Sequence, residues 1–303
     1  MGPTASGKTD AAKLLFDSFP IDIISVDSAQ VYRGFNIGSA KPKQEELNKY
    51  PHHLVDCKGP CDRYSVNEFK LDVENVSANI YKKNRIPILV GGTMMYFNSL
   101  VNPLNEMPES SKEARKNVEK DLDKYGLQGI YKKLSEIDPE IVKKIKGTDR
   151  QRIMRALEVY YISGKPLSFY HKPKMKPDIN SMLHKIALIP SNRSLLNNRI
   201  EIRVKNMLKN GFIEEVESLL KKNPSLDLTY PALRSVGYKQ VYEYIMGLIS
   251  FDDLPEKIII ATRQLAKRQM TWIRGMENLL VIDPFDKAFD VKITNSVKEF
   301  IEN

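Results

Sequence analysis

Hydrophobic residues in the first third of the chain follow two alternating patterns. Short β-branched runs bounded by polar residues or glycine occupy Ile21–Val26 and Ile86–Val90, and such runs are typical of buried parallel strands. Between them, Asn67–Lys83 carries apolar residues at the spacing of an amphipathic helix. These helix-spaced residues are Phe69, Val73, Val76 and Ile80. The alternation predicts an α/β fold with a layered parallel sheet.

The pattern changes between residues 109 and 176, where strand signals stop and Lys and Glu become frequent. Within this stretch, Asp149–Ile162 predicts an amphipathic helix, with Asp149 as its N-cap. The apolar stripe of this helix comprises Ile153, Leu157 and Tyr160. The stretch therefore predicts helices without strands.

A strand pattern returns at Lys185–Ile189, and helical patterns then continue through Ile273. We therefore expect a core formed by residues 1–108 and 184–303, interrupted by an all-helical insertion domain. That insertion spans residues 109–183 and is closed by the polar, proline-containing segment 171–177.

Composition narrows the class of protein. The chain has 303 residues, 42% of them hydrophobic, and a net charge of +9 from 47 basic and 38 acidic residues. That length and apolar content exclude disorder and allow a substantial core. No apolar run approaches the roughly 20 residues of a membrane helix, and no signal-peptide pattern opens the chain. We expect a soluble, cytoplasmic monomer without a membrane partner, whose positive charge serves either a polyanionic partner or solubility.

The most informative motif lies at the start of the chain. It matches the complete G-x-x-x-x-G-K-[ST] pattern of a P-loop, a nucleotide- or ATP-binding loop in many enzymes. Its residues are Gly2, Pro3, Thr4, Ala5, Ser6, Gly7, Lys8 and Thr9. Backbone amides of such a loop surround a diphosphate, Lys8 adds positive charge, and the Thr9 hydroxyl ligates Mg²⁺. A strand should precede this loop, whereas Met1 alone precedes Gly2.

Two further polar groups follow predicted strands. Asp27 comes directly after Ile21–Val26, where it is a metal ligand, a general base or a simple turn residue. The strand Ile86–Val90 ends in Gly91-Gly92-Thr93, which offers a hydroxyl group and flexible amides but no acid. The spacing alone leaves these alternatives for Asp27 open.

A set of motifs resembles the tRNA dimethylallyltransferases. They occur in the family's order over about residues 1–283. They comprise Gly2–Thr9, Ser25–Gly34, Gly38–Pro42, Pro51–Asp56, Leu89–Thr93, Gln151–Val159, Val236–Gln240 and Ala261–Gln269. The resemblance implies a P-loop nucleotide-kinase-like core with a helical insert that embraces the tRNA anticodon arm.

The resemblance also implies the reaction. The family transfers a dimethylallyl group from dimethylallyl diphosphate to the exocyclic N6 amine of the adenosine at tRNA position 37, 3′ of the anticodon. By this resemblance Lys8, with Mg²⁺ at Thr9, neutralises the leaving diphosphate, Asp27 holds and deprotonates the amine, and Thr93 contacts the substrate. Asp27, Ser28, Ala29 and Gln30 resemble the segment with which the family reads the extruded base.

Basic residues are the candidate contacts for tRNA and diphosphate, and a solvated helix face is the alternative for each. The family match assigns tRNA contact to Arg115, Gln151, Arg152, Ile153, Met154 and Arg155. Arg263, Lys267 and Arg274 are spaced along one line of a predicted helix, as a rail for phosphates would be. Arg199 and Arg203, four residues apart, either cap the diphosphate or are solvated.

Three rival functions and one metal site remain as alternatives. The rivals are a nucleotide kinase or NTPase with Mg²⁺ at Asp27, a prenyltransferase acting on free adenine nucleotides, and a non-catalytic RNA-binding protein. The group His52, His53, Cys57 and Cys61 suggests zinc, but adjacent histidines and a C-x₃-C spacing fit structural zinc sites poorly. The basic residues favour the tRNA function over the first two rivals, and the intact Lys8, Thr9 and Asp27 disfavour the third.

Overall fold

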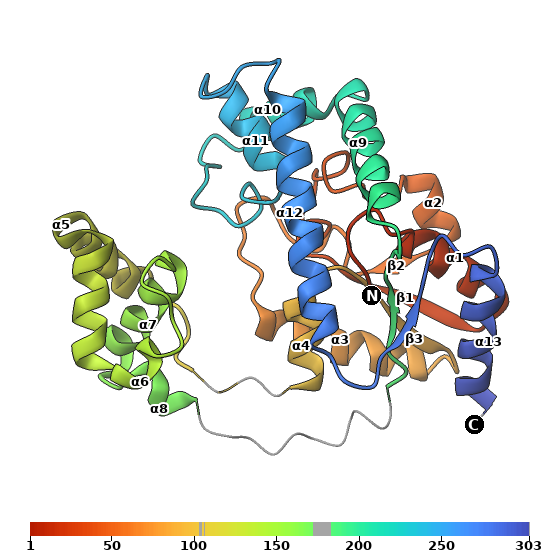
Figure 1. Ribbon diagram of the computed structural model, residues 1–303, viewed down its shortest axis with the longest axis horizontal. Helices are drawn as coiled ribbons and strands as arrows, with labels where there is room; N and C mark the ends of the chain where they lie inside the picture. Colours follow the sequence, from red (N-terminus) through yellow and green to blue (C-terminus); the bar gives the residue numbers. More distant parts are fainter. Residues whose placement is uncertain (103–104, 106, 172–182, 303) are drawn as a thin grey trace. The chain divides into compact units, whose positions relative to one another are not determined.

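The computed structural model consists of two compact units (Figure 1). It describes residues 1–102, 105, 107–171 and 183–302. One unit comprises residues 1–100 and 181–303, and the other comprises residues 101–180. The segment 172–177, most of the stretch expected to close the insertion, lies outside the described residues.

A parallel sheet forms the centre of the first unit. Its strands β1 (Ile21–Val26), β2 (His52–His53) and β3 (Ile86–Gly91) are arranged in the order β2-β1-β3. β1 and β3 pair along their full length, from Ile21 opposite Ile86 to Val26 opposite Gly91. The two strands predicted from the hydrophobic runs are confirmed. Their carboxyl ends lie side by side, so the residues that follow them meet at one edge.

Helix α3 (Val66–Tyr81) connects β2 to β3 and covers the sheet (Figure 1). It begins at a capping box, in which Ser65 Oγ accepts from the Glu68 amide at 3.1 Å and the Glu68 carboxylate accepts from the Ser65 amide at 2.8 Å. Its Phe69, Val73 and Ile80 side chains are buried. The helix predicted over this stretch is therefore confirmed.

A second parallel pair of strands, β4 (Ile186–Leu188) and β5 (Leu280–Ile282), lies next to the residue that precedes the P-loop. The Leu188 amide donates to the Met1 carbonyl oxygen at 2.8 Å. The backbone of Met1 thus pairs with β4 as a strand residue would, and the loop follows directly. Helix α1 (Lys8–Ser18) packs against α13 (Phe289–Glu302).

The remaining helices of the first unit include a group that packs together, α9 to α12 (Figure 1). The remaining helices are α2 (Gln44–Lys49), α4 (Met94–Val101), α9 (Arg193–Lys209), α10 (Phe212–Lys222), α11 (Tyr238–Ile245) and α12 (Leu254–Arg274). Ala266, Met270 and Ile273 on α12 are buried. The other faces of this long helix are thereby left for polar contacts.

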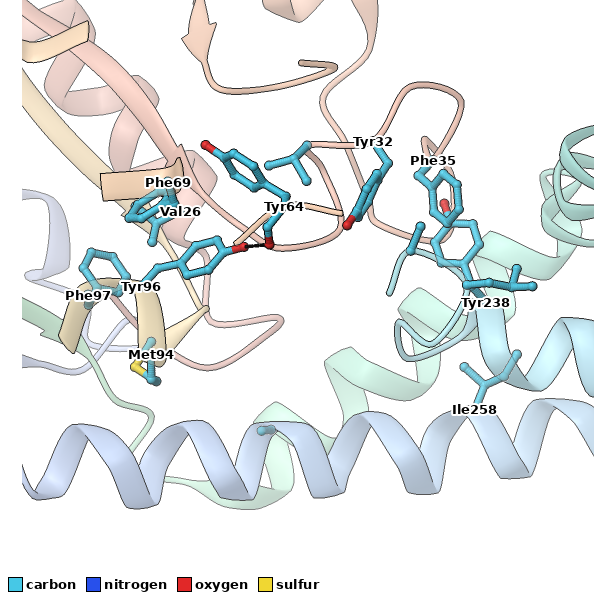
Figure 2. Close-up of a cluster of buried hydrophobic side chains, with 14 of the residues drawn as sticks. Val26, Tyr32, Phe35, Tyr64, Phe69, Met94, Tyr96, Phe97, Tyr238 and Ile258 are labelled. Atoms are coloured by element: carbon cyan, nitrogen blue, oxygen red, sulfur yellow. Dashed lines mark hydrogen bonds between the residues drawn. The ribbon is translucent and has the colours of Figure 1, made fainter. Parts of the chain in front are cut away.

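An aromatic cluster joins the sheet to these helices (Figure 2). Tyr96 stacks on Phe69 with ring centroids 4.2 Å apart, and Phe35 packs on Tyr238 at 4.3 Å. Tyr32 lies between these two pairs in Figure 2 and contacts Phe35. Aromatic packing of this kind stabilises a core strongly. It anchors the loop after β1 between the sheet and α11.

The second unit contains helices alone within its described residues. They are α5 (Lys112–Ile137), α6 (Pro139–Val142), α7 (Arg150–Ser163) and α8 (Leu167–Tyr170). α7 begins where the sequence predicts, because Asp149 Oδ1 accepts from the Arg152 amide at 3.2 Å. Its Ile153 and Leu157 side chains are fully buried against α5 residues such as Val118.

The predicted fold class is confirmed. The chain combines an α/β core, with a P-loop and a parallel sheet, and an all-helical unit formed by an internal segment. Across the described part of the chain, no helix has both the length and the apolar character that crossing a membrane requires.

Candidate active site

The P-loop leads directly into helix α1. Gly7 is the N-cap residue with φ of 82°, a conformation that glycine adopts freely. Ala5 also lies in the left-handed region, with φ of 62°. This costs a residue with a Cβ roughly 1–3 kcal/mol and is typical of ligand-binding loops. The amides of the loop and the positive end of α1 together form a site for an anion.

The Lys8 ammonium group lies inside this loop. Its Nζ donates a hydrogen bond to the Pro3 carbonyl oxygen at 2.6 Å. Burial lowers the pKa of Lys8 to about 8, while the nearby Asp27 carboxylate raises this pKa and Arg203 lowers it. A bound diphosphate would favour the charged form of the amine. Lys8 is therefore placed to bind an anion, and a bound anion would raise the pKa of its amine.

A cavity of about 1320 Å³ opens beside the loop. Its lining brings Lys8, Thr9, Arg199 and Arg203 together, as the diphosphate assignment requires. Arg203 donates weakly to Thr4 Oγ1 and to the Ser39 carbonyl oxygen, both at 3.5 Å, and burial lowers its pKa. The Arg199 guanidinium lies 4.4 Å from the centre of the Phe285 ring. Of the two interpretations of this arginine pair, the location at the cavity favours anion binding over simple solvation.

Asp27 lies at the carboxyl end of β1 with one oxygen fixed. Its Oδ1 accepts from the Ala29 amide at 2.8 Å and from the Gln30 amide at 3.3 Å. Within the described part of the chain, Oδ2 has no hydrogen-bond partner. One oxygen thus holds the turn, while the other is available to a substrate proton.

Thr93 lies next to Asp27 because it follows the neighbouring strand. Thr93 Oγ1 accepts from the Ser28 amide at 3.0 Å and donates to Ser28 Oγ at 3.3 Å. Gln30 is also held, since its Nε2 donates to the Ser39 carbonyl oxygen at 3.3 Å. The structure therefore brings the predicted Asp27–Gln30 segment and Thr93 into one network.

In the helical unit, Arg115 and Arg155 converge on a buried carboxylate. Glu158 is 3% exposed. Its Oε2 lies 3.2 Å from Arg155 Nη1 and 3.8 Å from Arg115 Nη2. Ser110 Oγ donates to its other oxygen, and Arg155 Nη2 donates to the Pro108 carbonyl oxygen at 2.7 Å. A buried carboxylate shared by two arginines fixes both side chains at the surface.

The remaining residues of the α7 motif differ in exposure. Gln151 and Arg152 are exposed, and Met154 is half-buried. Ile153 is fully buried in the core of the helical unit. This corrects the expectation that Ile153 contacts tRNA: its side chain supports the helix from inside, because it belongs to the apolar stripe.

The basic residues that are aligned along α12 differ in whether they are available to a ligand. Lys267 and Arg274 are exposed. Arg263 instead forms an ion pair with Glu201 of α9. The sequence of α12 shows no acid in this region, so the partner comes from a distant helix. Lys267 is therefore the clearer candidate for a phosphate contact.

Thr9 is a suitable Mg²⁺ ligand when a diphosphate is present. It lies in the first turn of α1 and lines the cavity. Among the described residues, no three His, Cys, Asp or Glu side chains are grouped as metal ligands, and this holds for the region of His52 and Cys57 as well. Mg²⁺ typically takes one or two protein oxygens and completes its shell with phosphate oxygens and water. A hydroxyl group beside a phosphate loop fits that preference.

Sequence reasoning missed two polar side chains that support the site. Glu215 of α10 accepts from the Ile37 amide at 2.7 Å and from the Tyr238 hydroxyl at 2.7 Å, so it holds the loop that lines the cavity. Gln269 of α12 binds the backbone of the P-loop and of the segment before Thr93. A signal for Gln269 exists in the sequence, since it is an amide next to Met270 on the apolar face of a helix.

These features define an α/β protein with a P-loop, a cavity lined by basic residues and a carboxylate at the end of a neighbouring strand. A family model described as IPP transferase matches residues 30–276. A tRNA dimethylallyltransferase of Legionella pneumophila (strain Paris) is 46% identical over 304 residues, which cover 100% of this chain and 96% of the relative. One from Methylobacillus flagellatus is 46% identical over 99% of this chain and 96% of its own length. The chain belongs to the tRNA dimethylallyltransferase, or IPP transferase, family.

Solved structures agree with this assignment. The tRNA isopentenylpyrophosphate transferase of Bacillus halodurans is 32% identical with a TM-score of 0.70, covering 99% of this chain and 95% of that one. A eukaryotic dimethylallyltransferase acting on tRNA gives a TM-score of 0.79 at 26% identity, over 100% of this chain and 78% of that one. The resemblance inferred from the motifs is confirmed.

Proposed function

We propose that this protein transfers the dimethylallyl group of dimethylallyl diphosphate to N6 of adenosine 37 in tRNA and releases diphosphate. The observation that carries the proposal is the juxtaposition of Lys8 with Asp27, which is close enough to raise the pKa of Lys8. An anion site and a carboxylate with a free oxygen are thus neighbours. A transferase with a diphosphate leaving group needs both.

The diphosphate is proposed to bind in the P-loop. Lys8, Arg199 and Arg203 surround it with positive charge, and Thr9 would hold Mg²⁺. The metal would supply further charge neutralisation for the leaving group. Because Lys8, Thr9 and Arg203 are half-buried, their attraction for the developing negative charge is stronger than it would be in water. Arg199 is exposed and contributes less.

The adenine amine is proposed to lie at Asp27. Its nitrogen forms a bond to the allylic carbon as the bond from that carbon to the diphosphate oxygen breaks. The N6 proton passes to Asp27 Oδ2, while Oδ1 stays bound to the amides of Ala29 and Gln30. Thr93 and Ser28 hold the base beside the carboxylate.

The anticodon arm is proposed to bind the basic surfaces. In the helical unit these are Arg115, Gln151, Arg152, Met154 and Arg155, and on α12 they are Lys267 and Arg263. Each is at least partly exposed. Contacts of this kind to phosphates supply affinity, whereas recognition of the extruded adenine beside Asp27 would supply the specificity.

Labelled dimethylallyl diphosphate tests the proposal when it is incubated separately with unmodified tRNA, AMP and ATP. We expect label in tRNA alone, at adenosine 37. Label in AMP or ATP would support the free-nucleotide prenyltransferase instead. Transfer of phosphate from ATP without prenyl transfer would support the kinase.

Replacing Lys267 tests the contribution of α12 to tRNA binding. Lys267→Ala is expected to weaken tRNA binding and to reduce the slope of log affinity against log salt by about one unit, because one phosphate contact is lost. Lys298→Ala, an exposed lysine of α13, is the matched control. Filter binding at several salt concentrations measures both slopes. An unchanged slope in Lys267→Ala would make this face a solvated surface.

The low pKa of Lys8 predicts a pH dependence. Its pKa of about 8 means that the amine loses its charge as the pH rises above 8. Dimethylallyl diphosphate binds the charged form, so kcat/KM for this substrate should fall with increasing pH above about 8 at saturating tRNA. Lys8→Arg keeps its charge and should remove that fall. An identical pH profile in both proteins would assign the fall to another group.

Replacing Glu158 by Gln tests whether this carboxylate positions the two arginines for tRNA or only repels the tRNA phosphates. The two roles predict opposite changes in tRNA affinity. If Glu158 positions Arg115 and Arg155, Glu158→Gln should weaken tRNA binding several-fold. Removing any negative charge near a polyanion would by itself strengthen binding. Glu140→Gln, which removes an exposed acid of the same unit, should therefore bind equally well or slightly better. Tighter binding by Glu158→Gln would exclude the positioning role.

A further inference from the structure

Gln269 is a buried amide on an otherwise apolar helix face. It is 7% exposed and lies beside Met270 on α12. Burying an amide costs free energy unless both its oxygen and its nitrogen find partners. Gln269 satisfies both with backbone groups of two loops. Its position is therefore fixed by polar contacts as well as by packing.

The two partners belong to different parts of the active site. Gln269 Oε1 accepts from the Thr4 amide of the P-loop at 2.8 Å. Its Nε2 donates to the carbonyl oxygen of Gly92 at 2.8 Å. The oxygen must face the amide hydrogen and the nitrogen the carbonyl, so the side-chain orientation is unambiguous. One amide group thus links the diphosphate loop to the residue that precedes Thr93.

Close packing around Gly92 leaves little freedom in this link. A Cβ atom at Gly92 would lie 2.4 Å from Gln269 Nε2 and 3.3 Å from the Gly2 carbonyl oxygen. The first distance is far below a van der Waals contact. An alanine here would displace the Gln269 amide from its hydrogen bonds, because the two loops and the amide meet without space for a methyl group.

We propose that Gln269 is a positioning residue that fixes the diphosphate loop relative to the Thr93 loop. This inference rests on the proposed function, in which one loop holds the leaving group and the other holds the adenine. Gln269 touches neither substrate and acts through the two backbones. Transfer needs the amine nitrogen in line with the allylic carbon, and a misplacement of about 1 Å can slow such a step about 100-fold.

The main test compares the same substitution, Gln to Met, at two positions of α12. Gln269→Met keeps the side-chain length but loses both hydrogen bonds, and Gln264→Met changes an exposed glutamine of α12. We expect Gln269→Met to lower the single-turnover rate about 10- to 100-fold at saturating substrates. Its tRNA affinity and its inhibition by inorganic diphosphate should stay close to wild type. Gln264→Met should behave as wild type in every measurement.

Two further variants separate positioning from simple stability. Gln269→Glu keeps the acceptor for Thr4 but places an oxygen against the Gly92 carbonyl, so it should retain inhibition by diphosphate and still react slowly. Gly92→Ala should also slow the reaction. In a Gln269→Ala background the closest contact of the methyl group is removed and only the Gly2 carbonyl oxygen, at 3.3 Å, remains near it, so Gly92→Ala should add little further loss there. Additive losses would contradict a shared contact.

Specific results would overturn the inference. These are equal rates for Gln269→Met and Gln264→Met, a rate loss that matches a loss of folded protein in thermal unfolding, or a defect confined to KM for dimethylallyl diphosphate. In each of these cases the wild type still modifies tRNA, so the proposed function stands. If the wild type itself fails to prenylate tRNA, the proposed function falls, and this inference falls with it.

Discussion

Asp27→Asn is expected to slow prenyl transfer about 10²- to 10⁴-fold in a single-turnover assay, the range typical for loss of a general base. Asparagine can keep a carbonyl oxygen toward the amides of Ala29 and Gln30, so the turn after β1 should survive. It removes the basic oxygen that receives the N6 proton. The fold, tRNA affinity and diphosphate affinity should therefore be preserved.

A magnesium series separates this role from the kinase alternative. If Asp27 held Mg²⁺, the defect of Asp27→Asn would diminish as the Mg²⁺ concentration increased. A general base predicts a rate loss that is the same at every Mg²⁺ concentration. Recovery at high Mg²⁺ would remove the base assignment.

Lys8→Ala is expected to reduce kcat/KM for dimethylallyl diphosphate about 10²- to 10³-fold, the usual effect of losing one preorganised group that stabilises developing charge. The ammonium lies inside the P-loop, whereas the basic surfaces proposed for tRNA are formed by other residues. Binding of tRNA without the isoprenoid should therefore be nearly unchanged in a filter assay.

Lys13→Ala is a suitable control for Lys8→Ala. Lys13 lies on the same helix, but its ammonium is paired with Glu46 outside the P-loop. It should leave the use of dimethylallyl diphosphate unchanged. If Lys8→Ala abolished tRNA binding in the absence of isoprenoid, the division between a diphosphate site and separate tRNA surfaces would be incorrect.

Local patterns determined much of this protein. The β-branched runs form β1 and β3, and most of the segment Asn67–Lys83, with its helical apolar spacing, lies in α3. Such elements are predictable because their hydrophobic periodicity depends on residues close together in the sequence. The P-loop is equally local, since it consists of the contiguous segment Gly2–Thr9. Asp27 and Thr93 were found because residues that follow parallel strands share one sheet edge.

Which contacts each side chain makes was decided by the tertiary structure. Ile153 belongs to a motif assigned to tRNA, yet it is buried. Arg263 gains an acid from α9, and Gln269 reaches a P-loop amide 265 residues away. Sequence periodicity cannot predict these contacts, because they depend on how helices and loops that are distant in the sequence pack together. The sequence therefore determined the elements and the chemical groups of the site, whereas packing decided which groups are buried, paired and held in place.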